Sequence, residues 1–201
     1  MTPTEFVTGL AEAMNVERTE LATVDRALAK QGMRQIARGR SRPDITLKEG
    51  VQIVCAWAGA QKLTGAANEV ERLKGYRPRS IPDDEYEAIT RKSKTVASIF
   101  GEEENQLYDM NFIEVVVWVT RQLGAKEEAA DRIWLAIEKG GVPEITYKPS
   151  LSTVRLEFRK FPIKLDWTTR QQGQTPKKNV TITSAVRGAV LKWIFDVTEG
   201  A

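Results

Sequence analysis

A short segment near the N-terminus constrains the fold of this chain more than any other. Residues 7–26, VTGLAEAMNVERTELATVDR, place apolar side chains at helical spacing on both sides of a short polar stretch. The small Ala11 and the turn residue Asn15, which enters left-handed dihedrals readily, suit two helices that cross after a tight turn. Leu21 and Val24 supply the apolar face that would hold the second helix against the first. The pattern predicts a helix-turn-helix, whose second helix can lie in the DNA major groove.

Two sets of side chains in this region are candidate DNA contacts. The first set points away from the Leu21/Val24 face of the second helix, where it can meet base edges or phosphates. It contains Arg18, Thr19, Thr23 and Arg26. The second set follows Gly32, the expected end of that helix, and is predicted to form a wing or arm on phosphates or in the minor groove. It contains Arg34, Arg38, Arg40 and Arg42.

Each set has a simpler alternative, namely a solvated helix face and a solvated basic loop. Glu17, Glu20 and Asp25 share the second helix and count against groove binding, although Glu can accept a hydrogen bond from cytosine.

The rest of the chain alternates between helical and extended patterns. Thr46 and Glu49 form a capping box that predicts a helix over 47–59, and a further helix is expected over 63–74. Later helices are predicted over 85–100, from Asn111 onward in MNFIEVVVWVTRQL (where a strand over FIEVVVWV stays open), over 126–141, and over 184–200 with Ser184 as N-cap. Alternating residues predict strands in 144–149, 152–161, 163–169 and 179–183.

The expected fold is therefore α+β and mostly helical. A winged-helix-like domain over residues 1–76 precedes a proline-containing linker over 77–84. Residues 85–201 are expected to form a second domain, with a helical middle, a short antiparallel β segment and a C-terminal helix, that serves oligomerisation or partner binding.

Composition narrows the classes of function. The chain has no histidine and one cysteine, so the common His-based catalytic triads, intrachain disulfides and cysteine zinc clusters do not apply. We expect neither an enzyme nor a bound cofactor or metal. No apolar run is long enough for a membrane span and no leader is evident, so a cytoplasmic protein is expected.

Charge is distributed unevenly along the chain. The first 80 residues carry 13 basic and 9 acidic side chains, whereas residues 81–140 carry 7 and 13, and the remainder 10 and 5. Basic segments favour phosphate contacts, while the acidic middle is better suited to solvent or a protein partner.

The first third of the chain resembles a known group of sequences. The run LAEAMNVERTELATVDRALAKQGMRQIARGRSRPDITLKEGVQIV is similar to N-terminal helix-turn-helix segments of uncharacterised phage and prophage proteins of alphaproteobacteria. In those proteins a segment like LAxxLGxxxATVxxxDRxLxxxGL precedes an arginine-glycine stretch, and Asn15 here replaces their turn glycine. The matching residues are Leu10, Ala11, Thr23, Val24, Asp25, Arg26, Gly32, Met33, Gly39, Arg40 and Thr46. The resemblance implies DNA binding in a mobile-element setting.

Three functions remain open at this stage. The leading expectation is a duplex DNA-binding protein of the phage or prophage type, acting as a transcriptional regulator and forming a homo-oligomer. One alternative is a small terminase-like packaging subunit that assembles a ring, by analogy of architecture alone. The other is an interaction module or inhibitor that meets a protein partner through residues 85–201 and does not bind DNA.

A paired substitution tests the wing hypothesis. Changing Arg38 and Arg40 together to Ala is expected to weaken binding to every DNA sequence and to flatten its salt dependence, because phosphate contacts are lost. Changes at Thr23 or Arg26 should instead alter the preferred sequence. DNA titrations at several salt concentrations measure both effects, and an unchanged affinity and salt slope in the Arg38/Arg40 variant would exclude the wing.

Overall fold

Two capped helices open the chain. The computed structural model describes residues 1–36, 43–78, 100, 105–148, 154–160 and 182–200. Helix α1 (Pro3–Met14) begins at a capping box in which the Thr2 side chain accepts from the Glu5 backbone N–H. Asn15 ends it in the left-handed region, at φ 54° and ψ 51°, and helix α2 (Arg18–Lys30) follows at once. The predicted positions of both helices and the left-handed Asn15 are confirmed.

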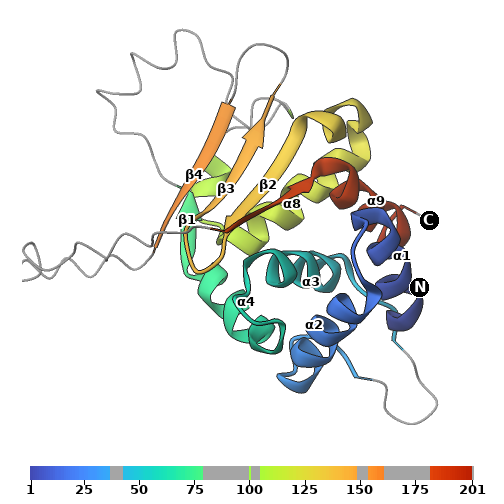
Figure 1. The fold of residues 1–201 in the computed structure, drawn as a ribbon. Helices are drawn as coiled ribbons and strands as arrows, with labels where there is room; N and C mark the ends of the chain where they lie inside the picture. Colours follow the sequence, from blue (N-terminus) through green and yellow to red (C-terminus); the bar gives the residue numbers. More distant parts are fainter. Residues whose placement is uncertain (37–42, 79–99, 101–104, 149–153, 161–181, 201) are drawn as a thin grey trace, which may run out of the picture.

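The next helices also follow the predicted ranges. Helix α3 (Leu47–Gly59) starts at the expected capping box between Thr46 and Glu49. A 3₁₀ turn, η1 (Leu63–Gly65), leads into α4 (Ala66–Lys74). Helix α3 is buried on almost all sides, as expected for a segment with hardly any polar side chains. It lies at the centre of the molecule, with α2 and α4 on one side, the sheet, α8 and α9 on the other, and α1 next to α2 and α9 (Figure 1).

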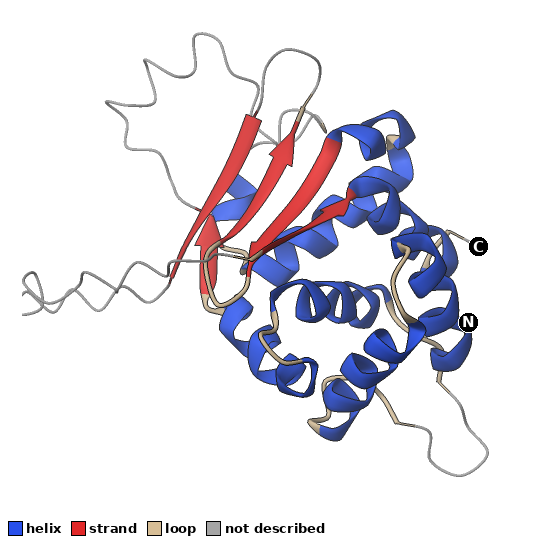
Figure 2. Cartoon of the chain, viewed as in Figure 1, coloured by secondary structure: helices blue, strands red, loops and turns tan. Residues whose placement is uncertain are grey.

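A five-stranded antiparallel sheet forms the second layer (Figure 2). Its order is β1-β4-β3-β2-β5. The strands are β1 (Tyr76–Pro78), β2 (Ile133–Glu138), β3 (Pro143–Tyr147), β4 (Val154–Lys160) and β5 (Thr183–Arg187). Side chains alternate along β2, so Ile133, Leu135 and Ile137 enter the core while the intervening residues lie on the open face.

Helices α8 (Phe112–Ala125) and α9 (Gly188–Thr198) pack against each other and against α3. Helix α8 confirms the helical interpretation of FIEVVVWV, because Asn111 caps it in a capping box with Glu114. The described residues also include the short helix α7 (Asn105–Tyr108) and the 3₁₀ segment η2 (Glu127–Arg132).

Two predicted elements differ from the structure. The helix expected over 126–141 is wrong, because only its first part coils, as η2, and the period-two pattern from Ile133 to Ile137 makes the rest strand β2. The helix expected to begin at Ser184 begins at Gly188, after strand β5. Val186 lies opposite Leu135 across the β2–β5 ladder, and both side chains are buried. This pairing keeps the residues of β5 extended, so the helix begins only after them. The expected strand over 163–169, residues 85–99 of the helix expected over 85–100, and residues 179–181 of the strand expected over 179–183 lie outside the described residues.

One core joins the two parts of the chain that the sequence separates at 77–84. Residues 77–78 are the end of β1 and pair with β4, so they are part of the sheet and not of a linker. Phe6 of α1 packs against Trp193 of α9, with ring centroids 5.4 Å apart. The buried apolar residues of α1, α3, α8, the sheet and α9 form a single cluster. Among the described residues, no helix is long and apolar enough to cross a membrane.

Gly50 offers a test of this shared core. A Cβ at Gly50 would lie 2.8 Å from side-chain carbons of both Phe6 and Ile194, so Ala does not fit without displacement. Although Ala is the better helix former, we expect Gly50→Ala to lower the free energy of unfolding by about 1–2 kcal/mol through overpacking. Urea unfolding followed by circular dichroism measures the change.

The matched control is Gly65→Ala, where a Cβ would meet no atom within 4 Å. That variant should stay within about 0.5 kcal/mol of the parent protein. Equal stability of the two variants would contradict the close contact of α3 with α1 and α9.

Candidate nucleic-acid interface

Helix α2 has one buried face and one outward face. Leu21, Val24 and Leu28 are buried against the neighbouring helices. The outward face carries a stripe of polar and basic side chains at positions i, i+4, i+7 and i+11, which lie above one another on a helix. The stripe consists of Thr19, Thr23, Arg26 and Lys30. Three of the four residues that the sequence predicts for DNA reading therefore share one face.

Local hydrogen bonds order this face. The Thr23 hydroxyl donates to the Thr19 carbonyl over 2.8 Å, and Arg26 donates from Nε to the Ala22 carbonyl over 3.1 Å. Arg26 Nη2 also lies 3.4 Å from Thr23 Oγ1. These contacts leave the Arg26 side chain exposed and directed along the helix surface.

Arg18, the fourth predicted residue, lies off this stripe. Its Nε donates to the Thr8 hydroxyl of α1 over 3.0 Å. Arg18 remains exposed, and this contact ties the first turn of α2 to the helix before it.

Two of the three acidic residues of this region are engaged away from the outward face. Glu20 accepts a hydrogen bond of 2.8 Å from the indole Nε1 of Trp57 in α3. Asp25 is buried and forms an ion pair with Arg34. Only Glu17, the N-cap residue of α2, stays exposed without such a partner among the described residues. The outward stripe therefore carries positive charge without a neighbouring acid from these three.

Arg34 holds the chain after α2 against that helix. Its Nε lies 2.5 Å from Asp25 Oδ1, and the Arg34 side chain is 13% exposed. Neither atom has a further hydrogen-bond partner among the described residues, so each charge is balanced only by the other member of the ion pair. The neighbouring backbone N–H of Gln35 donates to Glu49 over 2.6 Å. Arg34, predicted as a phosphate contact, thus has its guanidinium turned inward to a carboxylate.

Burial raises the pKa of Asp25, and Glu49 acts in the same direction. The Arg34 guanidinium lowers that pKa, with a smaller contribution from Arg26, so the cations offset part of the cost of burial.

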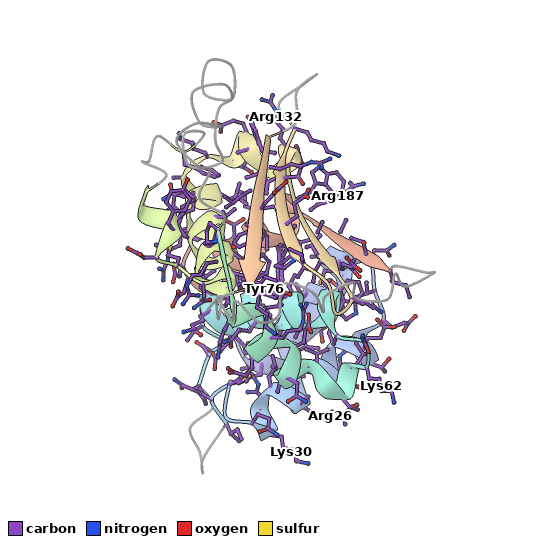
Figure 3. The ribbon with its side chains drawn as sticks, turned by 90° about the vertical axis from the view of Figure 1, so that its left-hand side faces the viewer. Arg26, Lys30, Lys62, Tyr76, Arg132 and Arg187 are labelled. Carbon is purple, nitrogen blue, oxygen red and sulfur yellow. The ribbon has the colours of Figure 1, made fainter. Side chains whose placement is uncertain are left out.

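Sequence reasoning missed Lys62, which lies just before η1. The residues of η1 contact α2, although they are more than thirty positions later in the chain. Lys62 is exposed, and Figure 3 shows it at the same end of the molecule as Arg26 and Lys30. No local pattern marks Lys62, because its position depends on how η1 packs. Arg38, Arg40 and Arg42, the rest of the predicted wing, lie outside the described residues.

Comparison with family models, with curated proteins and with solved structures gives no match for this chain. Within the described ranges, no group of three or more Cys, Asp or Glu side chains is arranged to hold a metal ion. Function is therefore inferred from the chain's own residues.

The Asp25–Arg34 pair predicts a pH-dependent variant. Because the folded pKa of Asp25 is raised, its contribution to stability is full at acidic pH and is lost as pH rises through that pKa. Arg34→Gln removes the cation that stabilises the ionised form. We expect this variant to lose about 1–3 kcal/mol of unfolding free energy near neutral pH. The deficit should shrink as pH falls through the raised pKa of Asp25, because the protonated carboxyl no longer needs the cation.

Urea unfolding of the variant and the parent protein at several pH values measures the deficit. Lys30→Gln removes an exposed cation of the same region and should show no such pH-dependent deficit. A deficit for Arg34→Gln that is constant with pH would show that Asp25 is not the group involved.

Proposed function

We propose that this protein binds duplex DNA, with α1, the turn at residues 15–17 and α2 acting as a helix-turn-helix. The observation that carries the proposal is the outward face of α2, where Thr19, Thr23, Arg26 and Lys30 line up while Glu20 and Asp25 are engaged elsewhere. In this assignment α2 enters the major groove and α1 lies across the backbone.

The side chains of the proposed DNA surface fall into groups with different roles. Arg26, Lys30 and Lys62 are the cations at one end of the molecule and neutralise phosphates (Figure 3). Thr19 and Thr23 are short enough to let α2 approach the base edges, where their hydroxyl and methyl groups meet polar atoms or a thymine methyl. Arg18, close to α1 through Thr8, is positioned for a flanking phosphate.

The resemblance of the first third to phage and prophage DNA-binding segments supports a role of the same kind. We propose a sequence-selective regulator, because the two threonines on the groove-facing helix offer base readout in addition to the charge of the cations. Homo-oligomerisation, expected from the sequence, would place two such helices on adjacent half-sites.

Removal of the three cations tests the surface. The variant Arg26→Ala/Lys30→Ala/Lys62→Ala should bind duplex DNA at least about a hundredfold more weakly near 150 mM salt. Its slope of log affinity against log salt should fall by about 2–3. Thr19→Ala removes no charge and should leave the salt slope unchanged while altering the preferred sequence. Fluorescence anisotropy with a labelled duplex pool, followed by sequence selection, measures these quantities.

The matched control is Arg132→Ala, since Figure 3 places this exposed cation at the opposite end of the molecule. Loss of this single distant charge should leave both the affinity for duplex DNA and the salt slope almost unchanged. A triple variant with unchanged affinity, or a parent protein that ignores duplex DNA at this salt concentration, would refute the proposal.

A further inference from the structure

A cleft of about 510 Å³ lies between the turn after α1 and strand β5, one of the two edge strands of the described sheet. This volume is in the range of small-molecule sites. Its walls include two indoles, from Trp57 of α3 and Trp134 of β2, together with the guanidinium-bearing Arg187 at the end of β5. Met14 and Val190 add apolar surface. A simple gap in the packing would not need two aromatic rings and one cation on its walls.

Arg187 is held in place by the sheet. It lies directly opposite Trp134 in the β2–β5 register, and its guanidinium carbon is 5.2 Å from the centroid of the Trp134 ring. Lys148 of the segment after β3 lies 5.8 Å from the same centroid. Both cations are exposed, and neither forms an ion pair with a described carboxylate. The cleft therefore has a positively charged margin ordered by cation–π contacts.

The opposite wall is ordered as well. The indole N–H of Trp57 donates to Glu20 over 2.8 Å, which fixes the orientation of a ring that stays partly exposed. Asn15, in its left-handed conformation, also lines the cleft. Its side-chain amide offers two donors and an acceptor and has no described hydrogen-bond partner.

These groups select the chemistry of a ligand. Indole and guanidinium planes stack on flat aromatic rings, and a guanidinium binds phosphate oxygens in a fork. A primary amide can read the polar edge of a nucleobase. We propose that the cleft binds a nucleotide, with its base against the indoles and its phosphate at Arg187. The nucleotide is either a free ligand or one unit of a single strand.

The cation of this site is separate from those of the proposed duplex surface, although the turn that supplies Asn15 also joins α1 to α2. Arg187 and Lys30 lie toward opposite ends of the molecule in Figure 3. Loss of the site should therefore leave duplex binding through α2 unchanged, and loss of the α2 cations should leave the cleft functional.

Calorimetric titration of the full chain with adenosine monophosphate tests the proposal. We expect saturable binding, weaker by at least about tenfold in Arg187→Ala because the phosphate contact and the stacking plane are both lost. Arg187→Lys keeps the charge without the planar group and should recover only part of the affinity. The control Arg132→Ala removes an exposed cation that does not line the cleft and should bind as the parent protein does. Ribose 5-phosphate, which lacks the base, should bind far more weakly than the nucleotide.

A second arm with a short oligothymidine distinguishes the two sources of the ligand. Tighter binding of the oligonucleotide per site, lost in Arg187→Ala, would identify a single strand, whereas tighter binding of the mononucleotide would identify a free ligand. Absence of binding by both probes up to about 5 mM would overturn the proposal. Equal loss in Arg132→Ala and Arg187→Ala would overturn it too, because general charge would then explain the binding. Circular dichroism of each variant confirms that the fold is kept.

Discussion

The burial of α3 on almost all sides is the constraint on which the rest of this structure depends. A helix with apolar side chains around its whole circumference requires partners in every direction. Here α2 and α4 cover one side, while α8, α9 and the β2–β5 edge of the sheet cover the other. Gly50 allows α1 and α9 to approach the same point of α3, through Phe6 and Ile194. The helices that carry the proposed DNA surface therefore cannot form their core without the sheet and the last helix.

The same arrangement gives α2 its two different faces. Its inner face is fixed by apolar contacts and by the Asp25–Arg34 ion pair, so the outer face is left to polar and basic side chains. Glu20 connects α2 to the cleft at the sheet edge, because the carboxylate that it contributes orients Trp57. One carboxylate is thereby directed away from the proposed groove-facing stripe and orders a wall of the proposed nucleotide site.

One predicted cap was confirmed and one was wrong, since Thr46 caps α3 as expected whereas Ser184 lies within strand β5. The capping boxes at Thr46 and Asn111 fix the starts of α3 and α8 because their hydrogen bonds join neighbours in the sequence. Predictions from the sequence failed where residues distant in the chain determine the local structure. The acidic, alanine-containing start of residues 126–141 favours a helix, yet β3 and β5 on either side draw Ile133 to Ile137 into a strand. In the candidate site, the outward stripe of α2 was predictable from helical spacing. The pairing of Arg34 with Asp25 and the position of Lys62 were not predictable from the sequence, because both depend on tertiary packing.

The contact between the first and last described helices, α1 and α9, affects how the protein folds while it is being synthesised. Phe6 is completely buried and packs on Trp193, which is joined to the growing chain long after Phe6. Proteins rich in such sequence-distant contacts fold slowly, since the chain between the partners must be closed into a loop first. The part of the apolar face of α1 that α9 covers therefore stays exposed on the ribosome until α9 has been synthesised. During that interval the nascent chain exposes the kind of surface that chaperones bind and that aggregation exploits.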